Sequence, residues 1–259
     1  MITSTRNPKI QWIRALQSRP KRRWEAQAFV VEGVRLTEEA LSAGIIPYMV
    51  LYTPELEERG RLVLQGFMSL GCAIIEVTSQ VMRATSDTQS PQGILAVLPI
   101  TNVHLPEKLN FVLIPDGIRD PGNLGSMLRS AAAAGVEAVL LPPETVDVYA
   151  PKVVRAAMGA HFHLPIHSTT WGEIKTLIEK SHLKVYLADA MAGEAYTKVD
   201  FRSPLALIIG GEAEGASQSA QSLAGKRVHI PMRGGSESLN AAAATAILLF
   251  EVVRQRTTV

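Results

Sequence analysis

Hydrophobic and polar positions follow two patterns along the chain, and both occur in the first hundred residues. Short apolar runs, AFVVEG (28–33), YMVLYT (48–53) and AIIEVT (73–78), are typical of strands. The segments between them space their apolar residues three or four positions apart, as amphipathic helices do. The pattern predicts a small alternating α/β unit, closed by a strand in SPQGILAVLPI, with helices at 6–17, 21–28, 34–44 and 55–69.

A polar stretch separates this unit from a second one. PITNVHLPEKLN (99–110) is bracketed by prolines and has no periodicity, which is typical of a linker. The alternation then restarts with six apolar runs, which are continuous rather than alternating and so favour a parallel sheet covered on both faces. We therefore expect an N-terminal domain at 1–100, a linker at 101–110 and a C-terminal domain at 111–259, with helices near 123–134, 151–159, 171–181, 215–224 and 239–255.

Composition narrows the class of protein. The 259 residues are 47% hydrophobic, enough for one or two cores, and no apolar run approaches the roughly 20 residues of a membrane span. The first residues contain no apolar stretch typical of a secretory signal. The single cysteine, Cys72, cannot form an internal disulfide. A cytoplasmic protein without a membrane partner is expected.

Charge is distributed unevenly. Residues 1–35 contain eight Lys or Arg against two Glu, a net charge of +6, whereas the remaining chain carries −4. Together with Trp12 and Trp24, this arm suits a nucleic acid, with charge for phosphates and rings for stacking. A solvated helix face anchored by two tryptophans explains the same residues, and the composition leaves both interpretations open. The candidate RNA-binding residues are Arg6, Lys9, Arg14, Lys21, Arg22, Arg23, Arg35 and, in the second domain, Arg119.

Candidate chemistry lies in three loops that follow strands of the second domain. In an open parallel sheet, ligands bind beyond the carboxyl ends of the strands. The loops are DGIRDPGNLGSMLR (116–129), GGEAEGAS (210–217) and PMRGGSESLN (231–240). They gather five polar side chains at one edge of the sheet, although each alone could be a helix cap: Asn123, Arg129, Glu212, Ser238 and Asn240.

Other chemistries fit these loops less well. An NAD site needs three glycines at fingerprint spacing, which PGNLGSML lacks, and no Lys-Ser/Thr pair follows the glycines as in a P-loop. No loop contains a histidine to activate a serine. His161, His163 and His167 should lie on one strand face, without a Cys or carboxylate at metal-binding spacing, so we expect structural or surface roles and no metal. Apolar strand ends beside glycines suit a planar ring such as adenosine.

Several segments resemble the motifs of SpoU/TrmH-type RNA ribose 2′-O-methyltransferases. They are DPGNLGSMLRSAAAAG, PKVVRAAMGAHFHLP, LIIGGEAEGAS and IPMRGGSESLNAAAATAILLFEVVRQR, and the resemblance covers residues 111–256. The N-terminal segments AFVVEGVRLTEEAL and SPQGILAVL are similar to the small substrate-binding domain of many members, which resembles an RNA-binding ribosomal-protein module.

The resemblance implies a fold and a cofactor. The catalytic domain is expected to be an α/β knot, a deep trefoil, that binds S-adenosylmethionine and forms a homodimer. Gly210, Ile230 and Leu239 match cofactor contacts of the family, and Ala188, Ile209, Gly211, Met232 and Ser238 complete the expected cofactor site. The five polar loop residues match its active-site set. One departure is Gly211, where the family often has Asn, and we expect activity to survive it.

The implied function is methylation of a ribose 2′-hydroxyl in structured RNA. Large-subunit rRNA is the expected substrate, because the extra N-terminal domain is commoner in rRNA-modifying members; a tRNA substrate and a non-catalytic RNA-binding scaffold are the alternatives. A guanidinium has no acceptor and hardly deprotonates. We therefore expect Arg129 to stabilise the developing alkoxide and hold a phosphate. Proton removal then requires Glu212, an RNA phosphate, water or a deprotonated Arg129, and the sequence leaves these alternatives open.

Overall fold

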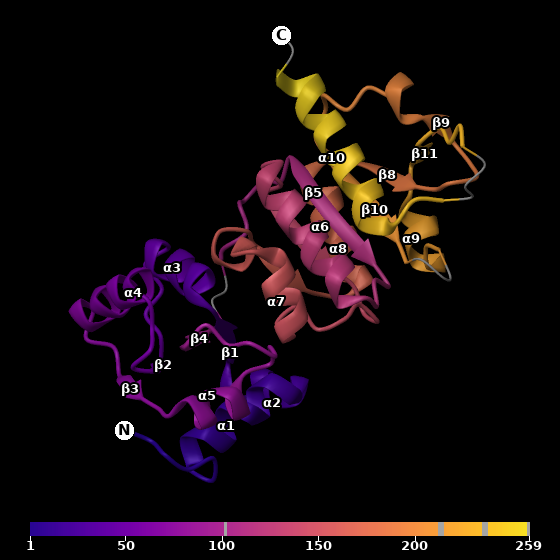
Figure 1. Ribbon diagram of the computed structural model, residues 1–259. Helices are drawn as coiled ribbons and strands as arrows, with labels where there is room; N and C mark the ends of the chain where they lie inside the picture. Colours follow the sequence, from indigo (N-terminus) through magenta and orange to yellow (C-terminus); the bar gives the residue numbers. More distant parts are fainter. Residues whose placement is uncertain (101–102, 212–214, 235–237, 258–259) are drawn as a thin grey trace. The chain divides into compact units, whose positions relative to one another are not determined.

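The computed structural model describes residues 1–100, 103–211, 215–234 and 238–257 (Figure 1). The chain divides into two units. The first consists of Met1–Thr101 together with Asp147–Phe162, and the second of Asn102–Val146 together with His163–Val259. The sequence assigns residues 147–162 to the second domain, whereas they pack within the first unit.

Two helices open the first unit. Helix α1 (Pro8–Ser18) begins after Asn7, whose side chain accepts a hydrogen bond from the Lys9 backbone N–H at 3.0 Å. Its apolar residues Ile10, Ile13 and Leu16 recur every three positions and are fully buried. Proline at position 20 then starts α2 (Pro20–Ala26), which ends at Gln27 in the left-handed region. The break at Pro20 agrees with the sequence.

The first unit has a four-stranded sheet in the order β1-β4-β2-β3. The strands are β1 (Ala28–Glu32), β2 (Met49–Tyr52), β3 (Ile74–Glu76) and β4 (Ile94–Pro99), and β4 is antiparallel to both of its neighbours. The helices that connect them are α3 (Val34–Ser42), α4 (Glu58–Ser69) and α5 (Ser79–Thr85). The hydrophobic pattern does not predict α5, which spans only seven residues and is capped by the Thr78 side chain.

Residues 147–162 complete the first unit through aromatic and ionic contacts. They contain α7 (Pro151–Ala157) and the short 3₁₀ helix η1 (Ala160–Phe162). The Tyr149 ring lies 4.9 Å from that of Phe29 and 5.6 Å from that of Trp24, between centroids. Asp147 forms an ion pair with Arg23. These contacts explain why residues 147–162 pack in the first unit, although the sequence pattern places them in the second domain.

The second unit is built on a seven-stranded sheet in the order β7-β6-β5-β10-β8-β11-β9. All its strand pairings are parallel. The strands are β5 (Phe111–Asp116), β6 (Ala138–Leu141), β7 (Ile166–Ser168), β8 (Lys184–Ala188), β9 (Glu194–Ala195), β10 (Leu205–Gly210) and β11 (Lys226–His229). The expected α/β class with a parallel sheet is confirmed. The two-residue strand β9 was not predicted, because it has no signal in the sequence.

Helices cover both faces of this sheet. On one face, α8 (Trp171–Ser181) and α9 (Gln218–Leu223) pack Ile174 and Ala220 against alternate strand residues such as Ile114 and Ile208. The remaining strand residues point to the other face, and there α6 (Pro121–Ala133) and α10 (Ala241–Thr257) pack together, with α10 also contacting β10. No helix in the described part of the chain combines the length and apolar character of a membrane span.

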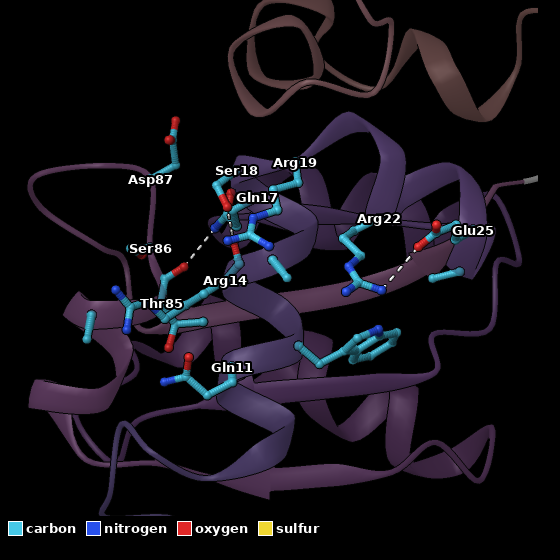
Figure 2. Close-up of a pocket in the computed structure, with 14 residues that line it drawn as sticks. Gln11, Arg14, Gln17, Ser18, Arg19, Arg22, Glu25, Thr85, Ser86 and Asp87 are labelled. Carbon is cyan, nitrogen blue, oxygen red and sulfur yellow. Dashed lines mark hydrogen bonds and ion pairs between the residues drawn. The ribbon is translucent and has the colours of Figure 1, made fainter.

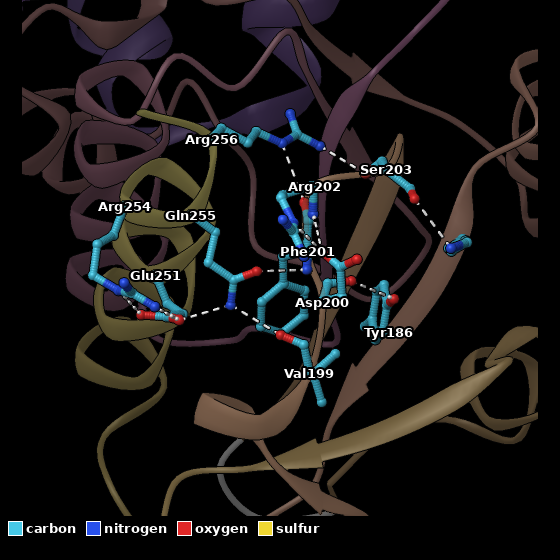
Figure 3. Close-up of polar contacts among 11 residues, drawn as sticks. Tyr186, Val199, Asp200, Phe201, Arg202, Ser203, Glu251, Arg254, Gln255 and Arg256 are labelled. Carbon is cyan, nitrogen blue, oxygen red and sulfur yellow. Dashed lines mark hydrogen bonds and ion pairs between the residues drawn. The ribbon is translucent and has the colours of Figure 1, made fainter. Parts of the chain in front are cut away.

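The last turns of α10 are tied to the segment that precedes β10 (Figure 3). The Gln255 side chain donates to the Val199 carbonyl at 2.9 Å and accepts from the Phe201 N–H at 2.8 Å. Arg256 donates to the carbonyls of Phe201 and Ser203, and its guanidinium lies 5.0 Å from the Phe111 ring centroid. These bonds hold the C-terminal end of α10 against the segment that precedes β10.

Candidate active site

A hollow lies at the carboxyl ends of β10, β8 and β11, and we call it the strand-end hollow. Its volume is about 370 Å³, within the range of about 300–1,000 Å³ typical of small-molecule sites. Ile209, Leu187 and Leu248 provide an apolar floor, and Gln221 and Asp189 add polar groups. Such a lining suits a flat, mostly apolar ligand with a few polar atoms.

The eight residues that the sequence assigns to a cofactor site all line the strand-end hollow. They come from the ends of three neighbouring strands and from the turn before α10, and Leu239 remains 37% exposed at the rim. Their grouping follows from the strand order, which places β10 beside β8 and β8 beside β11. The eight are Ala188, Ile209, Gly210, Gly211, Ile230, Met232, Ser238 and Leu239.

Two glycines, Gly210 at the end of β10 and Gly211 directly after it, allow a close backbone crossing. A Cβ atom on Gly210 would lie 2.6 Å from the backbone nitrogen of Ala216, and one on Gly211 would lie 2.7 Å from the carbonyl oxygen of Gly117. Neither position has room for a side chain. A side chain at Gly211 would require the Gly117 carbonyl to shift, so glycine suits this position.

A fourth loop, after β8, also contributes to the strand-end hollow, and the sequence interpretation missed it. Asp189 and Met191 line the hollow. The Asp189 carboxylate accepts from Arg227 Nη1 at 2.9 Å, and its backbone N–H donates to the Val228 carbonyl at 2.9 Å. The strand end KVYLADA was the available signal, since Asp189 directly follows β8.

Two of the five predicted active-site residues are in direct contact. Asn240 Nδ2 donates to Asn123 Oδ1 at 2.9 Å, while Asn240 Oδ1 accepts from the backbone N–H groups of Ala242 and Ala243 at 3.0 and 3.2 Å. Asn240 thus caps α10 and also positions Asn123. Asn123 in turn lies in the first turn of α6, where Asp120 accepts from its backbone N–H at 2.8 Å.

The remaining predicted active-site residues occupy different positions. Ser238 is exposed and lines the strand-end hollow, and Glu212 lies outside the described residues. Arg129 is exposed on α6, six residues beyond Asn123. That separation is about 9 Å along the axis and a third of a turn around it. Arg129 is not among the described residues that line the strand-end hollow of its own chain.

The outer surface of α10 carries exposed apolar side chains, and α6, which packs against α10, exposes Arg129. On α10, Ala243, Ile247 and Phe250 form one exposed stripe, and Phe250 is 48% exposed. On α6, Ser126 and Ala133 flank Arg129 on one exposed face. An exposed apolar stripe of this kind is typical of a surface that another protein covers.

The first unit has a basic cleft formed by α1, α2 and α5 (Figure 2). Its volume is about 860 Å³, and Arg14, Arg19 and Arg22 line it together with Trp12. Arg22 also pairs with Glu25 at 3.1 Å, but both side chains are about half exposed, so this pair is weak. Positively charged side chains that can contact phosphates, beside an aromatic ring that can stack on a base, are typical of a nucleic-acid-binding surface.

Most of the predicted RNA-binding residues are accessible, but Arg23 is not. It is 2% exposed and pairs with Asp147 at 2.5 Å, and its Nη1 donates to the Leu16 carbonyl at 2.5 Å. Its place in the charge run was misleading, because its neighbours Lys21 and Arg22 face solvent on the same short helix. Arg23 is a structural residue of the first unit. The other predicted RNA-binding residues are exposed: Arg6, Lys9, Arg14, Lys21, Arg22, Arg35 and Arg119.

The histidines do not lie on one strand face as the sequence pattern suggested, because β7 begins only at Ile166. His161 is buried in η1, and its Nε2 donates to the Val148 carbonyl at 2.8 Å. Burial lowers the pKa of His161 to about 4. Its other ring nitrogen has no partner among the described residues.

Within residues 1–100, 103–211, 215–234 and 238–257, no group of three His, Cys, Asp or Glu side chains is arranged to hold a metal.

Comparison with known families gives one match for each part of the chain. Residues 110–250 match the SpoU rRNA Methylase family. Residues 7–96 match the MRM3-like substrate binding domain. The family match spans more than half of the chain and contains every predicted active-site and cofactor residue.

Individual relatives align over almost the whole chain. The 23S rRNA (guanosine(2553)-2′-O)-methyltransferase RlmP of Bacillus subtilis is 31% identical over 97% of this chain and 98% of its own. Human mitochondrial rRNA methyltransferase 3 is 33% identical over 93% of this chain and 70% of its own. The crystal structure of the SpoU methyltransferase AviRb from Streptomyces viridochromogenes in complex with AdoMet superposes with a TM-score of 0.90 at 30% identity, covering 98% of this chain and 99% of that one.

Proposed function

Because the chain belongs to the SpoU rRNA methylase family, we propose that it transfers the methyl group of S-adenosylmethionine to a ribose 2′-hydroxyl of large-subunit rRNA. The observation that carries this proposal is the gathering of eight predicted residues, from the ends of β8, β10 and β11 and from the turn before α10, around one hollow at the sheet edge. Relatives that match nearly the full length of the chain are named as rRNA 2′-O-methyltransferases.

The lining of the strand-end hollow fits the cofactor. Ile209, Ile230 and Leu239 offer apolar contacts to an adenine ring, and the glycines after β10 bring backbone atoms close to it. When bound, S-adenosylmethionine supplies an electrophilic methyl group on a sulfonium. Several polar side chains of the lining are able to bind polar atoms of the cofactor, namely Asp189, Gln221, His229 and Ser238. The trefoil knot that the family implies is part of the proposal.

The asparagine pair and Arg129 act on the acceptor side. Asn240 fixes the orientation of Asn123 where α6 and α10 begin, and in this proposal Asn123 helps to position the ribose. The guanidinium of Arg129 stabilises negative charge on the 2′-oxygen and contacts a neighbouring phosphate. It does not accept the proton. Proton removal is assigned to Glu212, an RNA phosphate or water.

The active enzyme is a homodimer formed through the second unit. The exposed stripe of Ala243, Ile247 and Phe250 on α10, beside the exposed face of α6, supports this arrangement. Because Arg129 does not line the strand-end hollow of its own chain, the neighbouring subunit supplies it to that site. A two-fold axis then produces two equivalent sites.

RNA is collected by the first unit. The cleft lined by Arg14, Arg19, Arg22 and Trp12 provides charge and a stacking surface. In this proposal residues 1–100 bind substrate, 101–110 form the linker and 111–259 carry catalysis. With one cysteine in the sequence, we place the enzyme in the cytoplasm, where rRNA is available and thiols stay reduced.

A direct assay tests the proposal. Purified protein is incubated with S-adenosylmethionine labelled in the methyl group and with an unmodified transcript of large-subunit rRNA, and the RNA is digested to nucleosides. Label in a single 2′-O-methylnucleoside is expected. A tRNA transcript is assayed in parallel. Label in a methylated base, label in the tRNA but not in the rRNA transcript, or RNA binding without any transfer would each contradict the proposed reaction or substrate.

A further inference from the structure

A second hollow lies beside the strand-end hollow, on the other side of the loop that follows β10. We call it the flanking hollow. Its volume is about 340 Å³, and its lining comes from the loops after β5, β6, β7 and β10. Gly211, Gly215 and Ala216 line both hollows, so the two share a wall. The two hollows therefore adjoin along these residues.

One wall of the flanking hollow is aromatic. Trp171 is the first residue of α8 and is partly buried. Part of its ring packs against the hydrophobic core of the second unit, and the rest lines the hollow. The core contact fixes the ring, which makes it a rigid surface for a planar ligand.

The flanking hollow also has charged lining residues. Arg119, from the loop after β5, and Glu144, from the loop after β6, both line the flanking hollow. Their ion pair is 3.6 Å long and joins side chains that are 61% and 75% exposed. A pair this open contributes little to stability, so a phosphate can replace the carboxylate as the partner of Arg119.

The backbone at Glu144 is unusual. Four non-glycine residues of the described chain have a positive φ, and three of them, Gln27, Met158 and His182, end helices. The fourth, Glu144, has φ 71° in a loop that ends no helix. Such conformations persist where the surroundings enforce them, and they cluster at functional sites.

The floor of the flanking hollow is polar and fixed. Asp116, the last residue of β5, is 3% exposed, and its carboxylate accepts from the Ser217 backbone N–H at 2.6 Å. This bond holds the loop after β10 against the end of β5. The wall shared by the two hollows is thereby held at its Ser217 end.

We propose that the flanking hollow binds the nucleobase of the RNA nucleotide that is methylated, with the base stacked on Trp171 and a backbone phosphate held by Arg119. This inference rests on the proposed function. Methyl transfer requires the acceptor ribose beside the strand-end hollow, and the base attached to that ribose must lie within one sugar's length. RNA is read mainly through unstacked bases that stack on aromatic or arginine side chains, and the flanking hollow offers both beside the donor site.

Methyl transfer by variants of Trp171 tests the proposal on an unmodified large-subunit rRNA transcript. Trp171→Leu keeps apolar contact with the core but cannot stack a base, and kcat/KM should fall about tenfold or more. Trp171→Phe keeps a ring and should stay within about threefold of wild type. The affinity for S-adenosylmethionine, measured by calorimetry, should not change in either. Equal kcat/KM for wild type and Trp171→Leu overturns the inference, while activity of the wild type upholds the proposed function independently.

A charge-matched pair tests the phosphate contact. Arg119→Ala should raise KM for the transcript and reduce its salt dependence. Lys175→Ala, which removes an equally exposed cation from α8 outside the flanking hollow, should change neither. The same rise in KM for both variants contradicts a specific role for Arg119.

Fluorescence provides a readout that does not depend on catalysis or on the leucine variant folding. In Trp12→Phe/Trp24→Phe, Trp171 is the sole remaining tryptophan. A short oligoribonucleotide that spans the methylated position should quench its emission saturably. Unchanged emission while anisotropy shows the oligoribonucleotide bound overturns the proposal.

Discussion

Asn240 donates a hydrogen bond from Nδ2 to Oδ1 of Asn123 at 2.9 Å, which joins the first turns of α10 and α6. The same side chain caps α10 through its oxygen. The two roles use different atoms and are therefore separable by substitution. Asn240→Asp keeps an oxygen for the cap, where aspartate is among the preferred residues, but loses the donor that orients Asn123.

We expect Asn240→Asp to unfold at nearly the wild-type temperature while kcat/KM for methyl transfer falls about tenfold. Asn240→Ala should lose both activity and about 1 kcal/mol of stability, because the cap is lost as well. Thermal unfolding and methyl-transfer kinetics on the same preparations measure the two effects. Full activity of the aspartate variant would show that Asn240 serves only as a cap.

Substitution of Arg129 tests the role of its planar guanidinium. Arg129→Lys keeps the charge but loses the paired N–H donors that contact an alkoxide and a phosphate together. Activity should fall by more than about tenfold, with unchanged affinity for S-adenosylmethionine, since Arg129 does not line the strand-end hollow of its own chain. A lysine variant that methylates nearly as well as wild type would show that the paired N–H donors of the guanidinium are not required.

Mixing subunits tests whether Arg129 acts across a dimer. Arg129→Ala and Ser238→Ala are each expected to be nearly inactive alone. If each site takes Arg129 from the partner, a mixed dimer has one intact site, and an equal mixture should recover about a quarter of wild-type activity. No recovery after verified subunit exchange would place Arg129 in the site of its own chain.

Phe250→Glu should give monomers, because it puts a charge into the apolar stripe. Sedimentation measures the oligomeric state, and methyl-transfer assays should show that these monomers are inactive.

Adjacent arginines on α2 should respond in opposite ways. Arg22 lines the basic cleft and is exposed. Arg22→Ala should therefore reduce the slope of log K for RNA binding against log salt concentration by about one, without changing the free energy of unfolding. Arg23 is buried against Asp147, so Arg23→Ala leaves a buried carboxylate unpaired and should cost about 3–5 kcal/mol. Filter binding over a salt series and urea unfolding distinguish them. Similar behaviour of the two variants would contradict this assignment.

His161 should make the first unit sensitive to acid. Burial, opposed by its bond to Val148 and by the charge of Asp147, lowers the pKa of His161 to about 4. The unfolded chain takes up this proton below about pH 6.5, so stability is complete above that pH and is lost as the pH falls toward 4. The loss attributable to this group is at most about 3 kcal/mol.

His161→Gln provides the matched comparison, because glutamine keeps a donor for the Val148 carbonyl and does not titrate. Urea unfolding of wild type and variant at pH 7 and pH 4.5 measures the difference. The variant should be less sensitive to acid across this interval. Equal sensitivity would mean that carboxylates alone cause the loss.

The sequence predicted most elements of the fold because their hydrophobic patterns are local. Ile10, Ile13 and Leu16 mark the buried face of α1, and the apolar run Leu205–Gly210 marks a strand buried on both faces. The packing of residues 147–162 in the first unit depends on contacts such as Arg23 with Asp147, which are 124 residues apart. No local pattern carries that information, and the charge run that contains Arg23 looks the same whether a member is buried or exposed.

The candidate site was predictable to the extent that glycine-rich loops follow apolar strands. The order of β10, β8 and β11 then brings those loops together. Asp189 was missed because the loop after β8 lacks the glycine pairs that drew attention to the others. Trp171 was missed because a tryptophan at the start of a helix is ordinarily a core residue, and its second role depends on Arg119 and Glu144 from distant loops.

The most direct measurement is a map of ribose 2′-O-methylation across all cellular RNA, made from cells that contain this protein and from cells that lack it. The account predicts that a position in large-subunit rRNA loses its 2′-O-methyl group without the protein and regains it when wild type, but not Arg129→Lys, is restored. Identical maps from the two cell lines, or a change confined to base methylation, would contradict it.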